Sequence, residues 1–314
     1  MVWQQVTAFF YAQRSFTQCF APRRSGNTFA GDEFGSERNA PCPPLPSILT
    51  ATSLPSGHFP TISPVPHVDI FVPCFVDQLY PRTALNMVRV LERVGCTVRY
   101  NPAQTCCGQP AYNAGHHDAA RAVAAKFLAD FAAPADGPPR YVVSPSASCT
   151  GMVRNHYGLL FAPDIADAPT RDHCQQVQRR TYELTEFLVE VLGITAIPGA
   201  ALAGNYTYHD SCSALRECGI GPAPRLLLDG VAGLKRIEMA ETSTCCGFGG
   251  TFAVKFEAIS VAMAQQKVEY ALATGADYLI STDVSCLMHL EAYIKKEGLP
   301  LKCLHIADVL TSGW

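Results

Sequence analysis

The sequence lacks several features that would assign it to common functional classes. Lysine and arginine number 24 against 27 aspartates and glutamates, giving a net charge of −3, so a nucleic-acid role has little support. No charge-free run of about 18 apolar residues occurs, and we therefore expect no membrane span. No G-x-G-x-x-G fingerprint follows a predicted strand, so any flavin or nicotinamide chemistry would reside in another protein.

Cysteine, in contrast, is abundant: the 314 residues include 14 cysteines. A secreted disulfide scaffold could explain such a count, but the chain is long, is 48% hydrophobic and begins with no clear signal peptide. Metal or redox chemistry is the better explanation. Structural zinc sites usually contain Cys-x2-Cys pairs, which are absent here, so zinc is the less favoured metal.

Eight cysteines form two matched sets of four. The first set is Cys74, Cys106, Cys107 and Cys149, and the second set is Cys212, Cys245, Cys246 and Cys286. The gap before the Cys-Cys-Gly is 31 residues in the first set (75–105) and 32 in the second (213–244), and the gap after it is 40 (109–148) and 38 (248–285). This regularity indicates a duplicated unit. Four thiolates are the usual ligand count of an iron–sulfur cluster, so we expect one cluster per set at most, of the [4Fe–4S] type.

Strands and helices alternate along most of the chain. The expected strands are 68–72, 97–100, 141–143, 206–208, 234–239 and 277–280, and the expected helices are 82–94, 118–131, 183–192, 256–274 and 306–310. This order predicts an α/β fold of two similar, duplicated βα domains, each a parallel sheet flanked by helices. We place the first cysteine-rich domain at 67–200 and the second at 201–314.

Residues 1–66 differ from the rest because they are rich in proline, serine, threonine and glycine and show no lasting helical or strand period. We predict a disordered N-terminal extension. Basic residues precede the first acidic residue, Asp32, as in some organelle transit peptides, but a dispensable extension is the favoured interpretation.

Each cysteine group follows the C-terminal end of a predicted strand. Because parallel strands end at one edge of a sheet, residues 30 to 40 positions apart can converge there. Helices that begin beyond the cysteines would direct N–H groups to the same place and favour a negatively charged thiolate cluster. Gly108 and Gly247 follow the cysteine pairs and allow the turn that brings both thiols to one site.

The motifs around these cysteines resemble those of a known family. They are Pro73-Cys-Phe-Val-Asp-Gln78, Thr105-Cys-Cys-Gly-Gln-Pro110, His209-Asp-Ser-Cys212, Cys245-Cys-Gly-Phe-Gly-Gly250 and Asp283-Val-Ser-Cys-Leu-Met-His289. Over about residues 67–314 the chain is similar to the CCG cysteine-rich domain family. That family includes the cysteine-rich component of heterodisulfide reductase and the iron–sulfur subunits of glycolate oxidase and anaerobic glycerol-3-phosphate dehydrogenase. The resemblance is strongest to its lactate-utilisation members, which have two CCG units and no ferredoxin-type cysteine run.

This resemblance implies an iron–sulfur electron-transfer subunit of a cytoplasmic complex that oxidises L-lactate to pyruvate. The implied partners are a ferredoxin-like iron–sulfur protein and a third subunit of the lactate-utilisation complex, with a respiratory acceptor beyond them. Two alternatives stay open. One is a thiol–disulfide oxidoreductase like heterodisulfide reductase, and the other is the iron–sulfur subunit of a glycolate or glycerol-3-phosphate dehydrogenase.

The chain departs from the fullest family motif, which ends in Cys-x2-Cys. Met152 and His289 replace its second cysteine, which argues against disulfide cleavage by the relatives' chemistry. His289 is a candidate metal ligand or a hydrogen-bonded helix residue, whereas Met152 is expected to pack against its neighbours. His209 and Asp210 next to the second set are either a proton relay and hydrogen-bonding pair for the cluster or a polar turn that caps a helix.

The six remaining cysteines are expected to be structural or free thiols. They are Cys19, Cys42, Cys96, Cys174, Cys218 and Cys303. Cys218 has no counterpart in the first unit, and a helix after Cys212 could place it near the second set.

Overall fold

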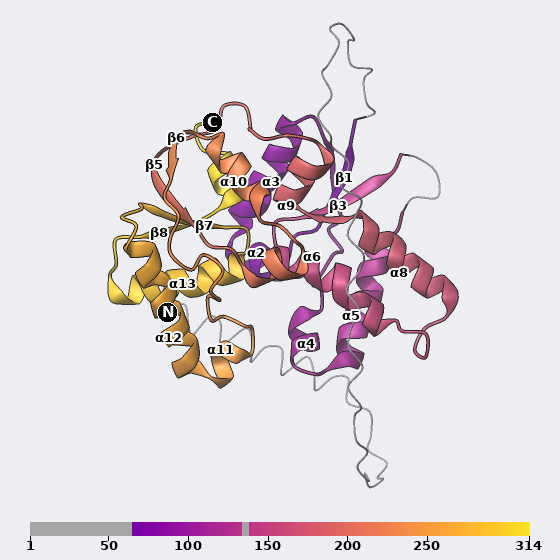
Figure 1. The fold of residues 1–314 in the computed structure, drawn as a ribbon. Coiled ribbons are helices and arrows are strands. Elements are labelled where there is room, and N and C mark those ends of the chain that lie inside the picture. The colour runs from indigo at the N-terminus through magenta and orange to yellow at the C-terminus, as the bar shows by residue number, and fades with distance from the viewer. Residues whose placement is uncertain (1–64, 134–137) are drawn as a thin grey trace, which may run out of the picture. The chain divides into compact units, whose positions relative to one another are not determined.

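The computed structural model describes residues 65–133 and 138–314, drawn from indigo to yellow in Figure 1. The disorder predicted for the N-terminal extension lies outside this range except at its last two residues, as do the roles predicted for Cys19 and Cys42. The described chain consists of two successive α/β halves.

The first half contains a four-stranded parallel sheet. Its strands are β1 (His67–Ile70), β2 (Thr97–Tyr100), β3 (Arg140–Ser144) and β4 (Thr181–Glu183), in the order β2-β1-β3-β4. Its helices are α2 (Cys74–Leu79), α3 (Pro81–Arg93), α4 (Gln109–Asn113), α5 (His117–Asp130), α6 (Ala147–Gly151), α7 (Tyr157–Leu160), α8 (Ala168–Arg180) and α9 (Leu184–Glu186). Two π-helical segments, η1 (Met152–His156) and η2 (Phe187–Val191), extend α6 and α9.

The second half repeats this architecture. Its strands are β5 (Ala201–Tyr208), β6 (Ala232–Arg236), β7 (Tyr278–Ser281) and β8 (Lys302–His305), in the order β6-β5-β7-β8 and again all parallel. Its helices are η3 (Ser213–Glu217), which is π-helical, α10 (Pro222–Asp229), α11 (Phe252–Lys255), α12 (Glu257–Leu272), α13 (Val284–Glu297) and α14 (Ile306–Leu310). The matched strand orders confirm the predicted fold of two duplicated parallel sheets flanked by helices.

Several elements were not predicted from the sequence, and for β4, α8 and α13 the physical reason is clear. Strand β4 is only three residues long, too short to show an alternating pattern. Helix α8 buries only Cys174 and Val177, so it has no apolar stripe for the sequence to reveal. Helix α13 begins within the second cysteine motif and buries residues on most of its circumference, which hides the helical period.

The two sheets contribute to one apolar core. Val68 and Leu91 of the first half and Tyr206 and Ile306 of the second are all fully buried in it. Burial of this kind is the main source of folding free energy, so the halves stabilise each other. The placement of a domain boundary at residue 200 stays a prediction.

Polar contacts also join the halves. The side chains of Thr83 and Asn86 on α3 donate hydrogen bonds to the Asp308 carboxylate on α14, at 2.9 and 2.7 Å. Near the cysteines, the Ser148 amide donates to Asp283 Oδ2 at 2.9 Å. These bonds fix the cysteine-bearing edge of the first half against that of the second. Among the described helices, none combines the length and apolarity that a membrane crossing requires.

Candidate metal centres

The first cysteine set gathers at the carboxyl edge of the first sheet. Cys74 begins α2, the pair Cys106 and Cys107 lies in the loop between β2 and α4, and Cys149 lies in α6 after β3. The Sγ atoms of Cys74 and Cys106 are 3.8 Å apart, and those of Cys107 and Cys149 are 3.4 Å apart. A hydrogen bond between the paired thiols links these two contacts. The structure therefore brings together all four residues of the set.

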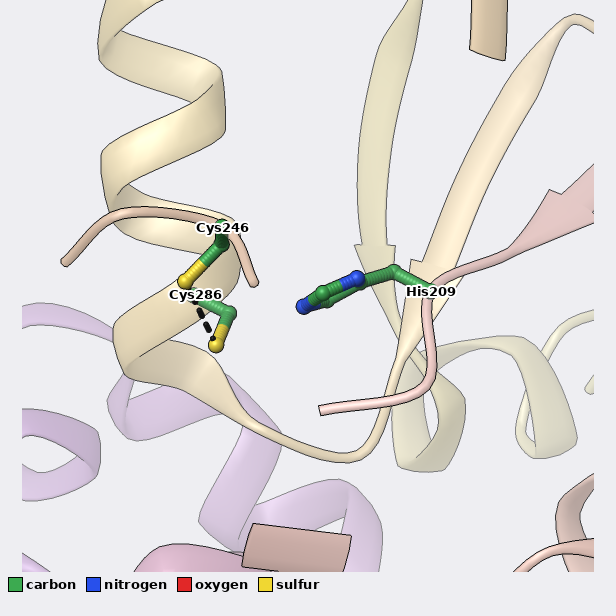
Figure 2. A group of neighbouring side chains, drawn as sticks. All are labelled: His209, Cys246 and Cys286. Carbon is green, nitrogen blue, oxygen red and sulfur yellow. Dashed lines mark hydrogen bonds between the residues drawn. The ribbon is translucent and has the colours of Figure 1, made fainter. Parts of the chain in front are cut away.

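The second set gathers at the corresponding edge of the second sheet. Cys212 precedes η3, the pair Cys245 and Cys246 follows β6, and Cys286 lies in the first turn of α13. The Sγ atoms of Cys246 and Cys286 are 2.9 Å apart, as the dashed line in Figure 2 marks. Hydrogen bonds connect Cys212 to Cys245 and Cys245 to Cys246. No disulfide forms among the described cysteines of either set.

Glycine turns place the adjacent cysteines as expected. Gly108 has φ +85° and Gly247 has φ +90°, in the left-handed region that favours glycine. The N–H of each glycine points to the sulfur two residues earlier, Cys106 or Cys245, at 3.4 Å in both cases. The turn thus aims both thiols at one site and supplies a backbone hydrogen bond to a sulfur.

One thiol in each set ionises most easily. Hydrogen bonds from Cys107 and then Cys74 hold the pKa of Cys106 well below its usual range. In the second set, the hydrogen bond from Cys212 is the main cause that lowers the pKa of Cys245 to about 2. Donating these bonds, together with burial, raises the pKa values of the three donors. Each set therefore shares protons among crowded thiols, and a bound metal group would replace those protons.

The donor chemistry fits an iron–sulfur group in both sets. Each site offers four cysteine sulfurs linked by successive pairwise contacts and one backbone N–H directed at a sulfur. Thiolates are the ligands that such clusters use, and N–H donors to sulfur tune their reduction potentials. The eight residues predicted from the sequence are therefore assembled as candidate ligands.

The residues that replace the fifth cysteine of the motif have different surroundings. Met152 is fully buried in an apolar cluster that includes Cys107 and Cys149. His289 is 6% exposed, and its Nε2 lies 3.1 Å from the hydroxyl and 3.2 Å from the carbonyl oxygen of Ser260. This contact is the hydrogen-bonded alternative considered from the sequence. A ligand role for His289 stays a prediction.

His209 faces the second set. It follows β5, is fully buried, and neither ring nitrogen has a hydrogen-bond partner among the described residues. A ring nitrogen and the Sγ atoms of Cys246 and Cys286 all lie within 4.8 Å of one another. Figure 2 shows the outer edge of the ring pointing at the two sulfur atoms. Burial, followed by the charge of Lys267, lowers the pKa of His209 to about 3, so the imidazole is neutral and can donate a lone pair.

The polar-turn interpretation of this segment applies to the neighbours of His209. The carboxylate of Asp210 accepts two hydrogen bonds from Arg225, both at 2.9 Å. Ser211 Oγ accepts the amide hydrogen of Ala214 at 3.2 Å, at the start of η3. Asp210 and Ser211 thus have structural partners, whereas the ring nitrogens of His209 have none among the described residues.

Lys267 is the residue of this site that sequence reasoning missed. It is fully buried on α12, and its Nζ donates to the carbonyl oxygens of Glu241 and Thr242, each at 2.7 Å, in the loop before Cys245. Burial lowers the pKa of Lys267 to about 8. The available signal was a lysine at helical spacing from the buried residues Ser260 and Ala264.

The other described cysteines belong to neither set. Cys218 is buried against α6, with its Sγ 3.5 Å from the carbonyl oxygen of Ala147, which fits the structural role expected for it. Cys96 and Cys174 are buried, and burial raises both pKa values to about 11. Burial also raises the pKa of Cys303.

Comparison with known proteins agrees with this arrangement. The family described as the CCG cysteine-rich domain matches residues 68–154 and 206–291. Lactate utilization protein A of Exiguobacterium sp. is 42% identical over 249 residues, covering 79% of this chain and 98% of the relative. Lactate utilization protein A 1 of Bacillus cereus is 42% identical over 245 residues, covering 78% and 98%.

Among solved structures, a hypothetical protein from Helicobacter pylori is similar with a TM-score of 0.50 and 12% identity. The match covers 80% of this chain and 49% of that protein, and at this identity it concerns the fold alone. The two matched segments contain all eight cysteines of the sets, four in each. The chain belongs to the CCG cysteine-rich domain family and carries two copies of that domain.

Proposed function

We propose that this protein is an iron–sulfur electron-transfer subunit of a complex that oxidises L-lactate to pyruvate. The observation that carries the proposal is the pair of four-thiol sets, each assembled at the carboxyl edge of its own parallel sheet. The similarity to proteins named Lactate utilization protein A supports the choice of substrate.

The residues of each set have distinct tasks in this proposal. Cys106 and Cys245, the thiols with lowered pKa values, most readily present a thiolate to a metal. The other cysteines complete each ligand set. An iron–sulfur cluster bound there supplies one-electron transfer. The amides of Gly108 and Gly247 then donate hydrogen bonds to ligand sulfurs and stabilise their negative charge.

Partners must complete the reaction. The sequence has no dinucleotide fingerprint after a predicted strand, so removal of hydride from lactate belongs to another subunit. We propose that electrons pass between this chain, a ferredoxin-like iron–sulfur protein and a third subunit of a cytoplasmic complex. The isolated chain is then expected to carry electrons without oxidising lactate.

Iron and sulfide measurements on the anaerobically purified full chain test the cluster assignment. With one [4Fe–4S] cluster in each set, the protein binds about eight irons and about eight sulfides. Cys107→Ser and Cys246→Ser should each remove about half of the iron, because each disrupts one set. Cys96→Ser is the matched control, since this buried thiol precedes β2 at the opposite end of the strand and should leave the iron content unchanged. Stoichiometric zinc without sulfide would contradict the proposal.

A growth experiment tests the substrate. A strain that lacks this gene should lose growth on L-lactate and keep growth on glycolate and glycerol 3-phosphate. Loss on glycolate or glycerol 3-phosphate alone would assign the chain to the corresponding dehydrogenase instead. Cleavage of a disulfide substrate by the isolated, chemically reduced chain would favour the thiol–disulfide oxidoreductase alternative.

A further inference from the structure

His209 occupies in the second half the position that Phe71 occupies in the first. Each residue directly follows the first strand of its half and stands three positions before the first cysteine of its set. The Phe71 amide donates to the Val143 carbonyl at 2.9 Å, and the His209 amide donates to the Ile280 carbonyl at 2.9 Å. Because the backbones match, the two side chains start from equivalent places beside their cysteine sets.

The two side chains meet different neighbours. The Phe71 ring packs edge-on against Phe127 and Phe131, with centroids 4.8 and 5.8 Å away. It is thus held by apolar contacts. The His209 ring is just as deeply buried, but both nitrogens lack a hydrogen-bond partner among the described residues. Burying an imidazole without partners is unfavourable, so a buried group that binds one of its nitrogens would explain this histidine.

The nearby sulfur atoms indicate what that group is. The edge of the His209 ring is directed at the sulfurs of Cys246 and Cys286, and the three ligand atoms lie within 4.8 Å of one another (Figure 2). Such separations allow one metal centre to contact all three atoms. Imidazole nitrogen and thiolate sulfur are both established ligands of iron.

The other histidine of this site is already engaged. His289 Nε2 contacts the hydroxyl and the carbonyl oxygen of Ser260, and Ser260 Oγ in turn donates to the Gly247 carbonyl at 2.7 Å. These contacts hold the His289 ring against α12. The two histidines therefore differ in the same structure, since one has partners and the other faces the thiols without any.

We propose that His209 is a nitrogen ligand of the metal group held by the second cysteine set, an inference that rests on the proposed function. It binds on the side of Cys246 and Cys286, where its nitrogen adds to the four thiols. The first set has Phe71 at this position and receives no nitrogen ligand there.

Pulsed EPR on the reduced, anaerobically purified full chain tests this ligand directly. The wild-type protein should show a coupling to a histidine nitrogen, recognised because it changes when histidine is labelled with ¹⁵N. His209→Phe installs the residue of the first half and should remove the coupling. His289→Met likewise installs the first-half residue and should retain the coupling.

Three results would overturn the proposal. They are a wild-type protein with iron and sulfide in both sets but no histidine coupling, a coupling that persists in His209→Phe, and a coupling lost in His289→Met. If His209→Phe does not fold, His209→Gln keeps a polar side chain and must also lose the signal. A wild-type chain without iron or sulfide refutes the proposed function as well, which distinguishes that failure from failure of the ligand assignment alone.

Discussion

The two halves share strand order and cysteine placement, but they surround their thiols with different chemistry. Four matched positions are apolar in the first half and polar in the second. They pair Phe71 with His209, Ala120 with Ser260, Phe127 with Lys267, and Met152 with His289. The helix register supports these pairs, because a Cβ at Gly108 would meet the Ala120 carbonyl and a Cβ at Gly247 would meet the Ser260 carbonyl. The duplicated fold therefore tolerates a change of polarity around an unchanged cysteine arrangement.

The two halves anchor the helix that follows the Cys-Cys-Gly turn in different ways. In the first half, Phe127 on α5 stacks edge-on against Phe71 beyond β1. In the second half, Lys267 on α12 donates instead to two carbonyls of the loop that leads to Cys245. Positive charge and polar hydrogens near a cluster stabilise its reduced state. We therefore expect the second centre to have the higher reduction potential.

The largest expected effect is on the free energy of unfolding, and it compares the apolar contact of Phe127 in the first half with the polar contacts of Lys267 in the second. Phe127→Ala should lower the free energy of unfolding by about 3–5 kcal/mol, because it leaves a cavity beside Phe71. Lys267→Met should cost about 2–3 kcal/mol, since it leaves two carbonyls without their donor while removing a buried charge. Urea unfolding of the full chain measures both values. A larger loss for Lys267→Met would show that the polar half depends more on this position than the apolar half does.

A second difference lies at the last strand of each sheet. Glu183 ends β4 and caps α9 by accepting the amides of Thr185 and Glu186 at 2.7 and 3.2 Å. His305 ends β8 and caps α14 by accepting the Ala307 amide on Nδ1 at 3.1 Å. Burial raises the pKa of Glu183 from 4.5 to about 8, whereas burial lowers the pKa of His305.

These opposite shifts predict opposite pH dependences. The folded protein retains a proton on Glu183 that the unfolded chain loses, so the contribution of Glu183 to stability should fall as the pH rises from about 5 to about 8. Glu183→Gln stays neutral and still accepts the amides, so it should remove about 3 kcal/mol of this decline. Urea unfolding at pH 5.5, 7 and 8.5 checks the prediction.

The matched control is His305→Asn, which retains an acceptor for the cap. The contribution of His305 to wild-type stability should fall as the pH drops below 6.5, because the unfolded chain takes up a proton that buried His305 refuses. The asparagine variant should lessen that acidic loss and leave the alkaline side unchanged. The same pH profile for both variants would contradict the comparison.

Much of the similarity between the two halves could be predicted from the sequence, because it depends on the spacing of the cysteines and of the strands before them. The matched gaps in the cysteine sets and the apolar strands before them predicted two parallel sheets with thiols at one edge, and the fold confirms this. Strand β4 could not be predicted, because three residues show no period. The role of Lys267 is likewise hidden, because its hydrogen bonds go to carbonyls 25 and 26 residues away and depend on the fold. His209 was noticed, but both His209 and Asp210 are buried, and only the fold shows that Asp210 pairs with Arg225 while the ring nitrogens of His209 have no hydrogen-bond partner among the described residues.

A further expected effect concerns the two glycine turns, which have nearly the same backbone conformation but different neighbours next to an added Cβ. A Cβ at Gly108 would lie 3.3 Å from the Ala120 carbonyl oxygen, whereas a Cβ at Gly247 would lie 2.5 Å from the Ser260 carbonyl oxygen. The left-handed conformation costs an alanine about 1–2 kcal/mol at either position. The overlap at Gly247 should add about 2 kcal/mol, because the obstructing atom is backbone that can move only with α12.

Urea unfolding of Gly108→Ala, Gly247→Ala and Gly250→Ala separates these two costs. Gly250 has φ +62° and no atom within 4 Å of an added Cβ, so its alanine variant measures the conformational cost alone. Gly108→Ala should resemble this control, and Gly247→Ala should be less stable than either and bind less iron at the second set. Equal losses of stability at all three glycines would mean that α12 shifts to accommodate the added methyl group at no energetic cost. The closer packing of the polar half would then have no energetic consequence at its cysteine turn.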